Sequence, residues 1–198
     1  MKEINVSGQK RTDLGKKASK AIRKEGLVPC NIYGEAKADG KPVAMAFTAT
    51  MSELRKIVYT PHIYVINLDI DGEHHTAILK ELQFHPVTDK LLHIDFYEIT
   101  DKKPIVIAVP IKLNGLAEGV RAGGKLAASV RSLKVRAAYT QIPERLEIDV
   151  TNLGLGKTIK VADLSFEGLE LVTPASVVVC QVKMTRSAMS AAAKAANE

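Results

Sequence analysis

Two alternating segments, joined by a two-residue turn signal, do most to restrict the fold of this chain. Between residues 63 and 70 a large side chain stands at every second position, at Tyr64, Ile66, Leu68 and Ile70. A period of two is typical of a strand that buries one face. Asp71-Gly72 follows directly and leads into another strand-like run over 76–82. The two runs therefore predict a β-hairpin within a mainly β fold.

The first hundred residues combine such strands with two short helices. Residues 91–98 alternate again, and a helix is predicted over 14–25 with Gly26 as its C-terminal stop. The capping box Thr50-Met-Ser-Glu53 predicts a second helix, which presents Leu54, Ile57 and Val58 on one face. Residues 1–100 are therefore expected to form a small barrel or a strongly curved sheet.

A second domain is predicted after the polar segment 101–104, which ends in proline. Further strand-like segments follow over 105–113, 129–138, 145–150 and 176–184. We expect a separate all-β domain over 104–184 and an alanine-rich tail over 187–198. The ten Lys/Arg and seven Asp/Glu of the second domain are too mild a bias to name its partner.

Nearly all of the net positive charge lies near the N-terminus. Residues 1–26 carry eight Lys/Arg and three Asp/Glu, whereas the rest of the chain carries twenty and nineteen. In the predicted helix, Leu14, Ala18, Ala21 and Ile22 form a narrow apolar stripe and lysines and arginines occupy much of the remaining surface. Concentrated cations of this kind favour a polyanionic partner, although a solvated basic helix face is the plainer alternative.

Composition excludes several classes of protein. The chain has no apolar run of about 18 residues and no signal-peptide pattern at its start, so neither a membrane span nor secretion is expected. Cys30 and Cys180 are far apart in the chain and stand among apolar neighbours. Buried free thiols in a reducing compartment are the expected state, which indicates a cytoplasmic protein.

Two segments imitate a phosphate-binding loop, and neither fits. The first, over 119–126, has the required glycine and lysine spacing but places Leu126 where a hydroxyl should bind magnesium. The second, over 151–158, ends in Lys157-Thr158 but lacks the leading glycine. Both lead into strand-like sequence, whereas the motif requires a helix. Nucleotide hydrolysis is therefore disfavoured, and we expect no enzyme.

The histidines and cysteines do not make a metal or catalytic site. His74 and His75 are adjacent on a predicted strand and point to opposite faces, while His85 and His93 lack partners at ligand spacing. Nothing around Cys30 suggests an activated thiolate. We therefore expect no metal, no cofactor and no catalytic residue.

The segment His93-Ile-Asp-Phe96 suggests a display of polar groups. On a strand, Ile94 and Phe96 enter the core, which leaves His93 and Asp95 together on the outer face. An ordinary amphipathic strand has the same pattern. A functional interpretation is a polar pair that contacts base edges or ribose hydroxyls of RNA.

Taken in order, these motifs resemble one bacterial family. They are Arg11…Gly15-Lys16…Ser19…Arg23, Pro29-Cys-Asn-Ile-Tyr-Gly34, His85-Pro86 and His93-Ile-Asp-Phe96, with the C-terminal segments 119–126 and 143–149. The chain is similar over its whole length to the large-subunit ribosomal protein numbered twenty-five, in its long two-domain form, also called the CTC or general stress protein type. Cys30-Asn31 departs from a stretch that is often more aliphatic in that family.

The resemblance implies a fold, a partner and a binding site. The fold is mainly β, with an N-terminal six-stranded β-barrel that carries short helices and a C-terminal all-β domain. The partner is 5S rRNA at its internal loop E, on the central protuberance of the large ribosomal subunit. The implied RNA-binding residues are Arg11, Lys16, Ser19, Arg23, Tyr33, His93 and Asp95.

Physical roles for these residues are hypotheses. Cationic side chains would neutralise phosphates, Ser19 would donate to phosphate, and Tyr33 would stack on a base or bond a ribose. His93 and Asp95 would distinguish loop E from a regular duplex. The alternative to a ribosomal role is a stress-responsive RNA-binding factor that acts partly off the ribosome.

Overall fold

The computed structural model describes residues 1–34, 37–38, 41–42, 44–100, 103–186 and 188. The predicted alanine-rich tail, apart from Ala188, lies outside the described residues. These residues fall into two compact units. The first comprises Met1–Ile105 with Ala138–Thr140, and the second comprises Val106–Ala137 with the described residues from Gln141 onward. Among the helices that the structure describes, none has the length and apolar character needed to cross a membrane.

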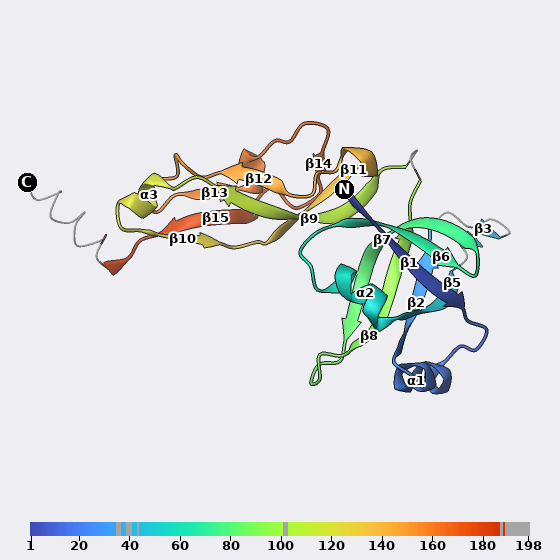
Figure 1. Cartoon of the computed structure of the whole chain (residues 1–198). Helices are drawn as coiled ribbons and strands as arrows, with labels where there is room; N and C mark the ends of the chain where they lie inside the picture. The colour runs from blue at the N-terminus through green and yellow to red at the C-terminus, as the bar shows by residue number, and fades with distance from the viewer. Residues whose placement is uncertain (35–36, 39–40, 43, 101–102, 187, 189–198) are drawn as a thin grey trace, which may run out of the picture. The chain divides into compact units, whose positions relative to one another are not determined.

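The first unit contains a closed β-barrel, which confirms the fold expected from the sequence (Figure 1). Its strands, in the order in which they pair, are β1 (Lys2–Lys10), β5 (Met45–Thr50), β2 (Leu27–Tyr33), β8 (Leu91–Glu98), β7 (Glu73–Phe84) and β6 (Tyr64–Ile70). The two parallel pairs, β1 with β6 and β2 with β8, join segments that are remote in the chain. A short β3 (Lys37–Ala38) and β4 (Lys41–Pro42) pair with each other.

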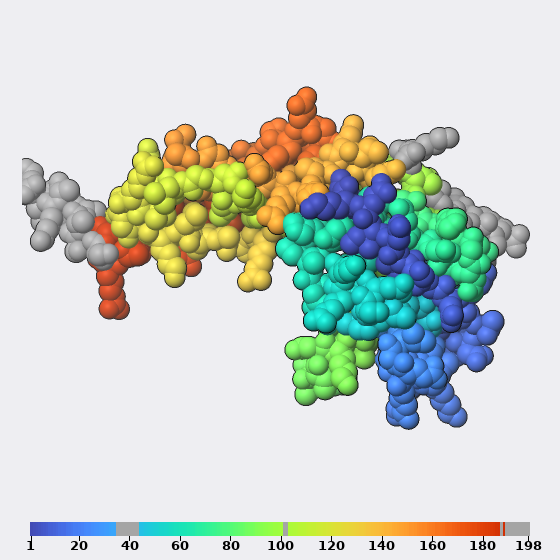
Figure 2. Space-filling view, in the orientation of Figure 1, coloured from blue at the N-terminus to red at the C-terminus, as the bar shows by residue number. Residues whose placement is uncertain are grey.

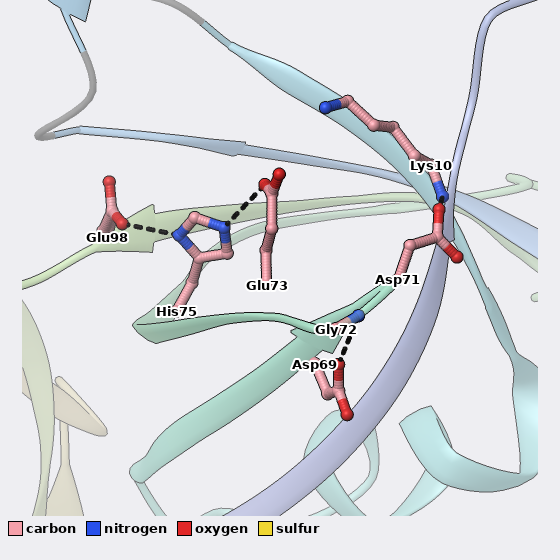
Figure 3. Close-up of polar contacts among 7 residues, drawn as sticks. All are labelled: Lys10, Asp69, Asp71, Gly72, Glu73, His75 and Glu98. Atoms are coloured by element: carbon pink, nitrogen blue, oxygen red, sulfur yellow. Dashed lines mark hydrogen bonds and ion pairs between the residues drawn. The ribbon is translucent and has the colours of Figure 1, made fainter.

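The predicted hairpin is the β6–β7 pair. Ile70 stands opposite Glu73, so Asp71 and Gly72 alone form the turn. Both have a positive φ, 52° and 89°, which is the conformation that a two-residue turn between twisted strands requires. The Asp69 carboxylate accepts the Gly72 N–H at 3.0 Å, and the Asp71 carboxylate accepts the Lys10 N–H at 2.8 Å (Figure 3). The second contact ties the turn to β1.

The alternating side chains of the strands fill the barrel. Phe47 of β5 and Phe96 of β8 are fully buried, with ring centroids 5.7 Å apart. Ile66, Leu68 and Ile70 of β6 join them in the same core cluster. Burial of large apolar side chains at every second position fixes which face of each strand points outward.

Two helices lie on the barrel. Helix α2 (Met51–Val58) starts at the predicted place and buries Leu54 and Ile57. The predicted capping box does not form, because the Thr50 hydroxyl bonds the Glu53 carboxylate at 2.9 Å and not a backbone N–H.

Helix α1 (Lys16–Lys24) is shorter than predicted. Leu14 lies outside it and is 70% exposed, because the backbone turns at Gly15, where φ is 102°. The helix buries no residue completely, and Ala18 and Ile22 of the expected stripe are half-buried. The stop at Gly26 is confirmed by its φ of 82°.

The second unit is also mainly β. One sheet has the order β12 (Leu146–Asp149), β9 (Ile105–Asn114), β11 (Ser132–Ala137) and β14 (Glu170–Leu171). The other has the order β10 (Lys125–Ala128), β15 (Val178–Lys183) and β13 (Thr158–Lys160). Short helical turns of this unit occur at α3 (Glu118–Arg121) and Val161–Asp163, whereas most of the turn Tyr139–Gln141 belongs to the first unit.

Candidate nucleic-acid interface

A continuous polar face covers the outside of three neighbouring barrel strands. In the parallel β2–β8 pair, Asn31 stands opposite Asp95 and Tyr33 opposite Tyr97. In the antiparallel β7–β8 pair, Glu81 stands opposite Asp95 and Gln83 opposite His93. Partners in register point to the same side of a sheet, so these side chains share one surface. We call the set Asn31, Tyr33, Glu81, Gln83, His93, Asp95 and Tyr97 the β8 face.

His93 and Asp95 form the centre of this face. Nδ1 of His93 lies 3.3 Å from Oδ1 of Asp95, and their side chains are 19% and 20% exposed. Ile94 and Phe96, which alternate with them, are fully buried. The structure thus confirms the division of β8 into a core side and an outer side.

Electrostatics at the centre of the face favour a neutral imidazole. Burial lowers the pKa of His93, the nearby Asp95 opposes this, and the positive charges of Arg23 and Arg11 lower the pKa further. A neutral ring has one N–H donor and one acceptor nitrogen, whereas the Asp95 carboxylate only accepts. The pair therefore presents donor and acceptor groups side by side on a half-buried surface.

Arg11 joins the end of β1 to helix α1. Its guanidinium donates to the Asp13 carbonyl at 3.0 Å and to the Ser19 hydroxyl at 3.3 Å. Nε of Arg11 is buried and has no hydrogen-bond partner among the described residues. The structure thus brings Arg11 and Ser19 together, and Arg11 holds the helix in place.

Arg23 joins the other end of α1 to β8. Its Nε donates to the Leu92 carbonyl at 2.9 Å, one residue before His93. Arg23 and Lys16 are both exposed, as are Lys17, Lys20 and Lys24 on the same helix. Helix α1 and the turn between β7 and β8 form two separate projections at one end of the barrel in the space-filling view (Figure 2). Because Arg23 ties α1 to β8, the exposed cations of α1 lie at the border of the β8 face.

An aromatic pair extends the β8 face two residues along β2 and β8 from Asn31 and Asp95. The rings of Tyr33 and Tyr97 meet edge to face, with centroids 6.1 Å apart and planes at 74°. Nζ of Lys80 lies 5.9 Å from the centre of the Tyr97 ring, within the range of a cation–π contact. Burial raises the pKa of Tyr33, and the negative charges of Asp95 and Glu81 add to this effect. Tyr33 therefore stays protonated and keeps its O–H donor.

Similarity to known proteins agrees with this architecture. Residues 6–96 match the ribosomal L25p family, and residues 104–186 match the C-terminal domain of ribosomal protein TL5. The chain is 59% identical over 196 residues to the large ribosomal subunit protein bL25 of Phocaeicola vulgatus, covering 98% of this chain and 99% of the relative. The chain belongs to the ribosomal L25p family.

Other members of the L25p family are similar over the same length. The proteins of the same name from Bacteroides thetaiotaomicron and Porphyromonas gingivalis are 54% and 50% identical, and each alignment covers 98% of this chain and 99% of the relative. The expected ribosomal protein family is thus confirmed in its two-domain form. Membership associates the chain with the cytoplasmic ribosome, and the family is one of structural proteins and not of enzymes.

The two segments that imitate phosphate-binding loops both lead into strands in this L25p member. Gly124 leads into strand β10, and Lys157 leads into strand β13. Neither loop precedes a helix, so the backbone N–H groups that would hold a phosphate are not assembled. Cys30 is fully buried, and burial raises its pKa to about 12, so this thiol is not an activated nucleophile.

His75 belongs to a separate polar cluster of the barrel (Figure 3). Its Nδ1 lies 2.8 Å from a carboxylate oxygen of Glu98, and its Nε2 lies 3.7 Å from Glu73. Within the described part of the chain, no group of three or more His, Cys, Asp or Glu side chains is arranged to hold a metal ion. The cluster links the start of β7 to the end of β8.

Sequence reasoning missed several residues of the β8 face. Tyr97 continues the period of two from His93 and Asp95, so the alternation alone was sufficient to include it. Asn31 and Gln83 required the pairing of β2 and β7 with β8. Lys80 is not part of the face but lies next to it at Tyr97, and the sequence could not place it because a shift of register between Leu79 and Glu81 breaks the alternation of β7.

Proposed function

We propose that this chain is a structural protein of the large ribosomal subunit whose barrel binds 5S rRNA at internal loop E. The observation that carries the proposal is the β8 face, where a half-buried His93–Asp95 pair lies beside tyrosines and is bordered by the cations of α1. Sequence-specific contacts to RNA are made mainly where bases are not in regular pairs. A fixed donor and acceptor pair suits such a target better than a plain duplex.

Each part of the interface contributes a different kind of contact. Lys16, Arg23 and the other exposed cations of α1 neutralise phosphates, which supplies affinity without sequence information. Ser19, held by Arg11, offers its hydroxyl beside them. Tyr33 provides an O–H group and an aromatic ring, and His93 and Asp95 make the directional contacts to bases or ribose.

The rigid main chain beneath the β8 face supports specific contacts. The main chain beneath His93 and Asp95 is fixed between the fully buried Ile94 and Phe96 and by pairing with strands on both sides. A rigid strand loses little conformational entropy on binding. This favours a recognition surface over a flexible basic arm.

Titration of the full-length protein with RNA tests the proposal. One RNA is intact 5S rRNA, and the other has loop E replaced by Watson–Crick pairs. We expect tight binding to the first and at least tenfold weaker binding to the second. Equal and strongly salt-dependent binding to both would mean that α1 is only a general polyanion patch.

A matched variant separates the proposed face from the rest of the barrel. Arg55 is an exposed cation on helix α2, so Arg55→Ala removes the same charge as Arg23→Ala at a different place. We expect Arg55→Ala to bind 5S rRNA like the unaltered protein.

A role off the ribosome as a stress factor would use the same face and would be recognised by a stable free pool of protein after cold or salt shock.

A further inference from the structure

The four-stranded sheet of the second unit pairs two of its three strand cations with carboxylates. Lys112 of β9 stands directly opposite Glu147 of β12, and Arg136 of β11 stands directly opposite Glu170 of β14. The charged atoms of the two pairs lie 3.7 Å and 3.4 Å apart. Opposite charges at directly paired positions stabilise a sheet modestly.

The three-stranded sheet of the same unit instead places two cations opposite each other. Lys125 of β10 stands directly opposite Lys183 of β15. The neighbouring pair, Leu126 and Val182, points to the other side, where Val182 is buried, so the two lysines share the outer face. Like charges at paired positions destabilise a sheet. No acidic residue occurs in β10, β15 or β13.

More exposed cations gather at this end of the sheet. The Lys157 carbonyl accepts the Val182 N–H at 3.0 Å, which places the start of β13 beside the end of β15. Helix α3, which ends at Arg121, packs near the start of β10 (Figure 1). Glu118, in the first turn of α3, is the acidic residue of this helix. We call Arg121, Lys125, Lys157 and Lys183 the β10–β15 basic patch.

Protection of sheet edges does not account for the patch. Lysines on edge strands keep a sheet from pairing with other chains, and this would explain Lys125 on the edge strand β10. Lys183 lies on β15, the central strand, which has partners on both sides. Its position opposite another lysine costs stability and protects no edge.

We propose that the β10–β15 basic patch is a second nucleic-acid contact of this protein and binds the phosphodiester backbone of ribosomal RNA. A phosphate between Lys125 and Lys183 would turn their repulsion into attraction. Gln181 and Thr158 are paired with each other and share the outer face with Lys183, so polar side chains lie beside the cations. The outer positions of these strands carry no aromatic ring for stacking. The contact is therefore to phosphate and sugar and does not read sequence.

Salt dependence of binding tests the patch in the full-length protein. The test variant is Lys125→Gln with Lys183→Gln, and the control is Lys112→Gln with Arg136→Gln, which removes two cations from the four-stranded sheet. Binding to large subunits that lack this protein is measured over a range of salt. We expect the slope of log K against log salt to become shallower by about 1.5 to 2 units in the test variant. The control should change it by less than about half a unit.

Binding to isolated 5S rRNA separates this proposal from that for the barrel. Both double variants retain the barrel, so their binding to 5S rRNA should equal that of the unaltered protein. Failure of every form to bind 5S rRNA would contradict the proposed function and leave the subunit measurement valid. The thermal unfolding temperature of the free test variant should be equal or higher, because the repulsion is gone.

Tethered cleavage identifies the chemistry of the partner. An iron chelate that generates hydroxyl radicals is attached at Thr158→Cys on the patch face, or at Ala108→Cys, an exposed control position on β9. The native Cys30 and Cys180 are fully buried and stay unlabelled. We expect cleavage of rRNA strands from position 158 and not from 108. An unchanged salt slope, or no rRNA cleavage from position 158, would overturn the proposal and favour a protein partner.

Discussion

Nδ1 of His93 lies 3.3 Å from Oδ1 of Asp95, two positions along β8 and on its outer side. The two buried residues that alternate with them fix the main chain of this strand, and β2 and β7 fix its neighbours. The pair is therefore positioned by the core of the barrel. A change in either side chain should affect recognition more than folding.

Replacement of Asp95 should reduce discrimination between RNAs. Asp95→Ala removes a directional acceptor and no phosphate contact, so the preference for loop E over a regular duplex should fall by about tenfold, or ~1.4 kcal/mol. The slope of affinity against salt should stay the same. Parallel titrations of the two RNAs measure this effect. Glu3→Ala, which removes an exposed carboxylate of β1 outside the β8 face, is the control. Equal losses on both RNAs would show that Asp95 has no part in specificity.

Replacement of the α1 cations should change the salt slope. Lys16→Ala and Arg23→Ala should each make it shallower by about one unit, because each removes one phosphate contact. Arg23 also bonds the Leu92 carbonyl, so Arg23→Lys should restore the slope but not the full affinity. Filter binding at several salt concentrations gives both values. Slopes that do not move would remove these side chains from the interface.

Acid should destabilise the protein through His93. Burial lowers the pKa of this side chain below its usual value of 6.5, so the unfolded chain takes up a proton at a higher pH than the folded chain does. The contribution of His93 is therefore fully present above pH 6.5 and is lost as the pH falls through the lowered pKa. Urea unfolding between pH 7.5 and 5 should show a smaller loss of stability for His93→Gln. An equal loss in both proteins would contradict this assignment.

Substitution of Gly119 should destabilise the second unit. A Cβ at this position would lie 2.6 Å from backbone atoms of Gly154 and Leu155, which cannot rotate away. We expect Gly119→Ala to lower the free energy of unfolding by about 1–3 kcal/mol. Gly154→Ala is the control, because its nearest new neighbour is a lysine side-chain carbon at 3.7 Å. Hydrogen exchange in β10 and β15, compared with β8, should locate the change. Similar behaviour of both variants would mean that the segment shifts freely.

The sequence was informative wherever the deciding interaction is local. The alternation in β6 and β8 identified their core sides, because a period of two is a property of the strand itself. Asp71-Gly72 identified its turn, since few residue pairs tolerate a positive φ at both positions. The basic character of α1 was equally plain, but the length of its apolar stripe and the depth of its burial were overestimated. The helix begins only after Gly15, which leaves Leu14 outside it, and a stripe of Ala18 and Ile22 needs only a shallow contact.

Tertiary structure alone decided which segments meet. The β8 face exists because β2 pairs in parallel with β8, more than fifty residues away in the chain, and nothing local in either strand specifies that partner. The charges of the second unit make the same point. Their total shows only a mild excess of cations, yet strand pairing sets Lys112 against Glu147 and Lys125 against Lys183. Composition and periodicity thus determined the class of fold and the outward side chains, whereas long-range pairing determined which of those side chains act together.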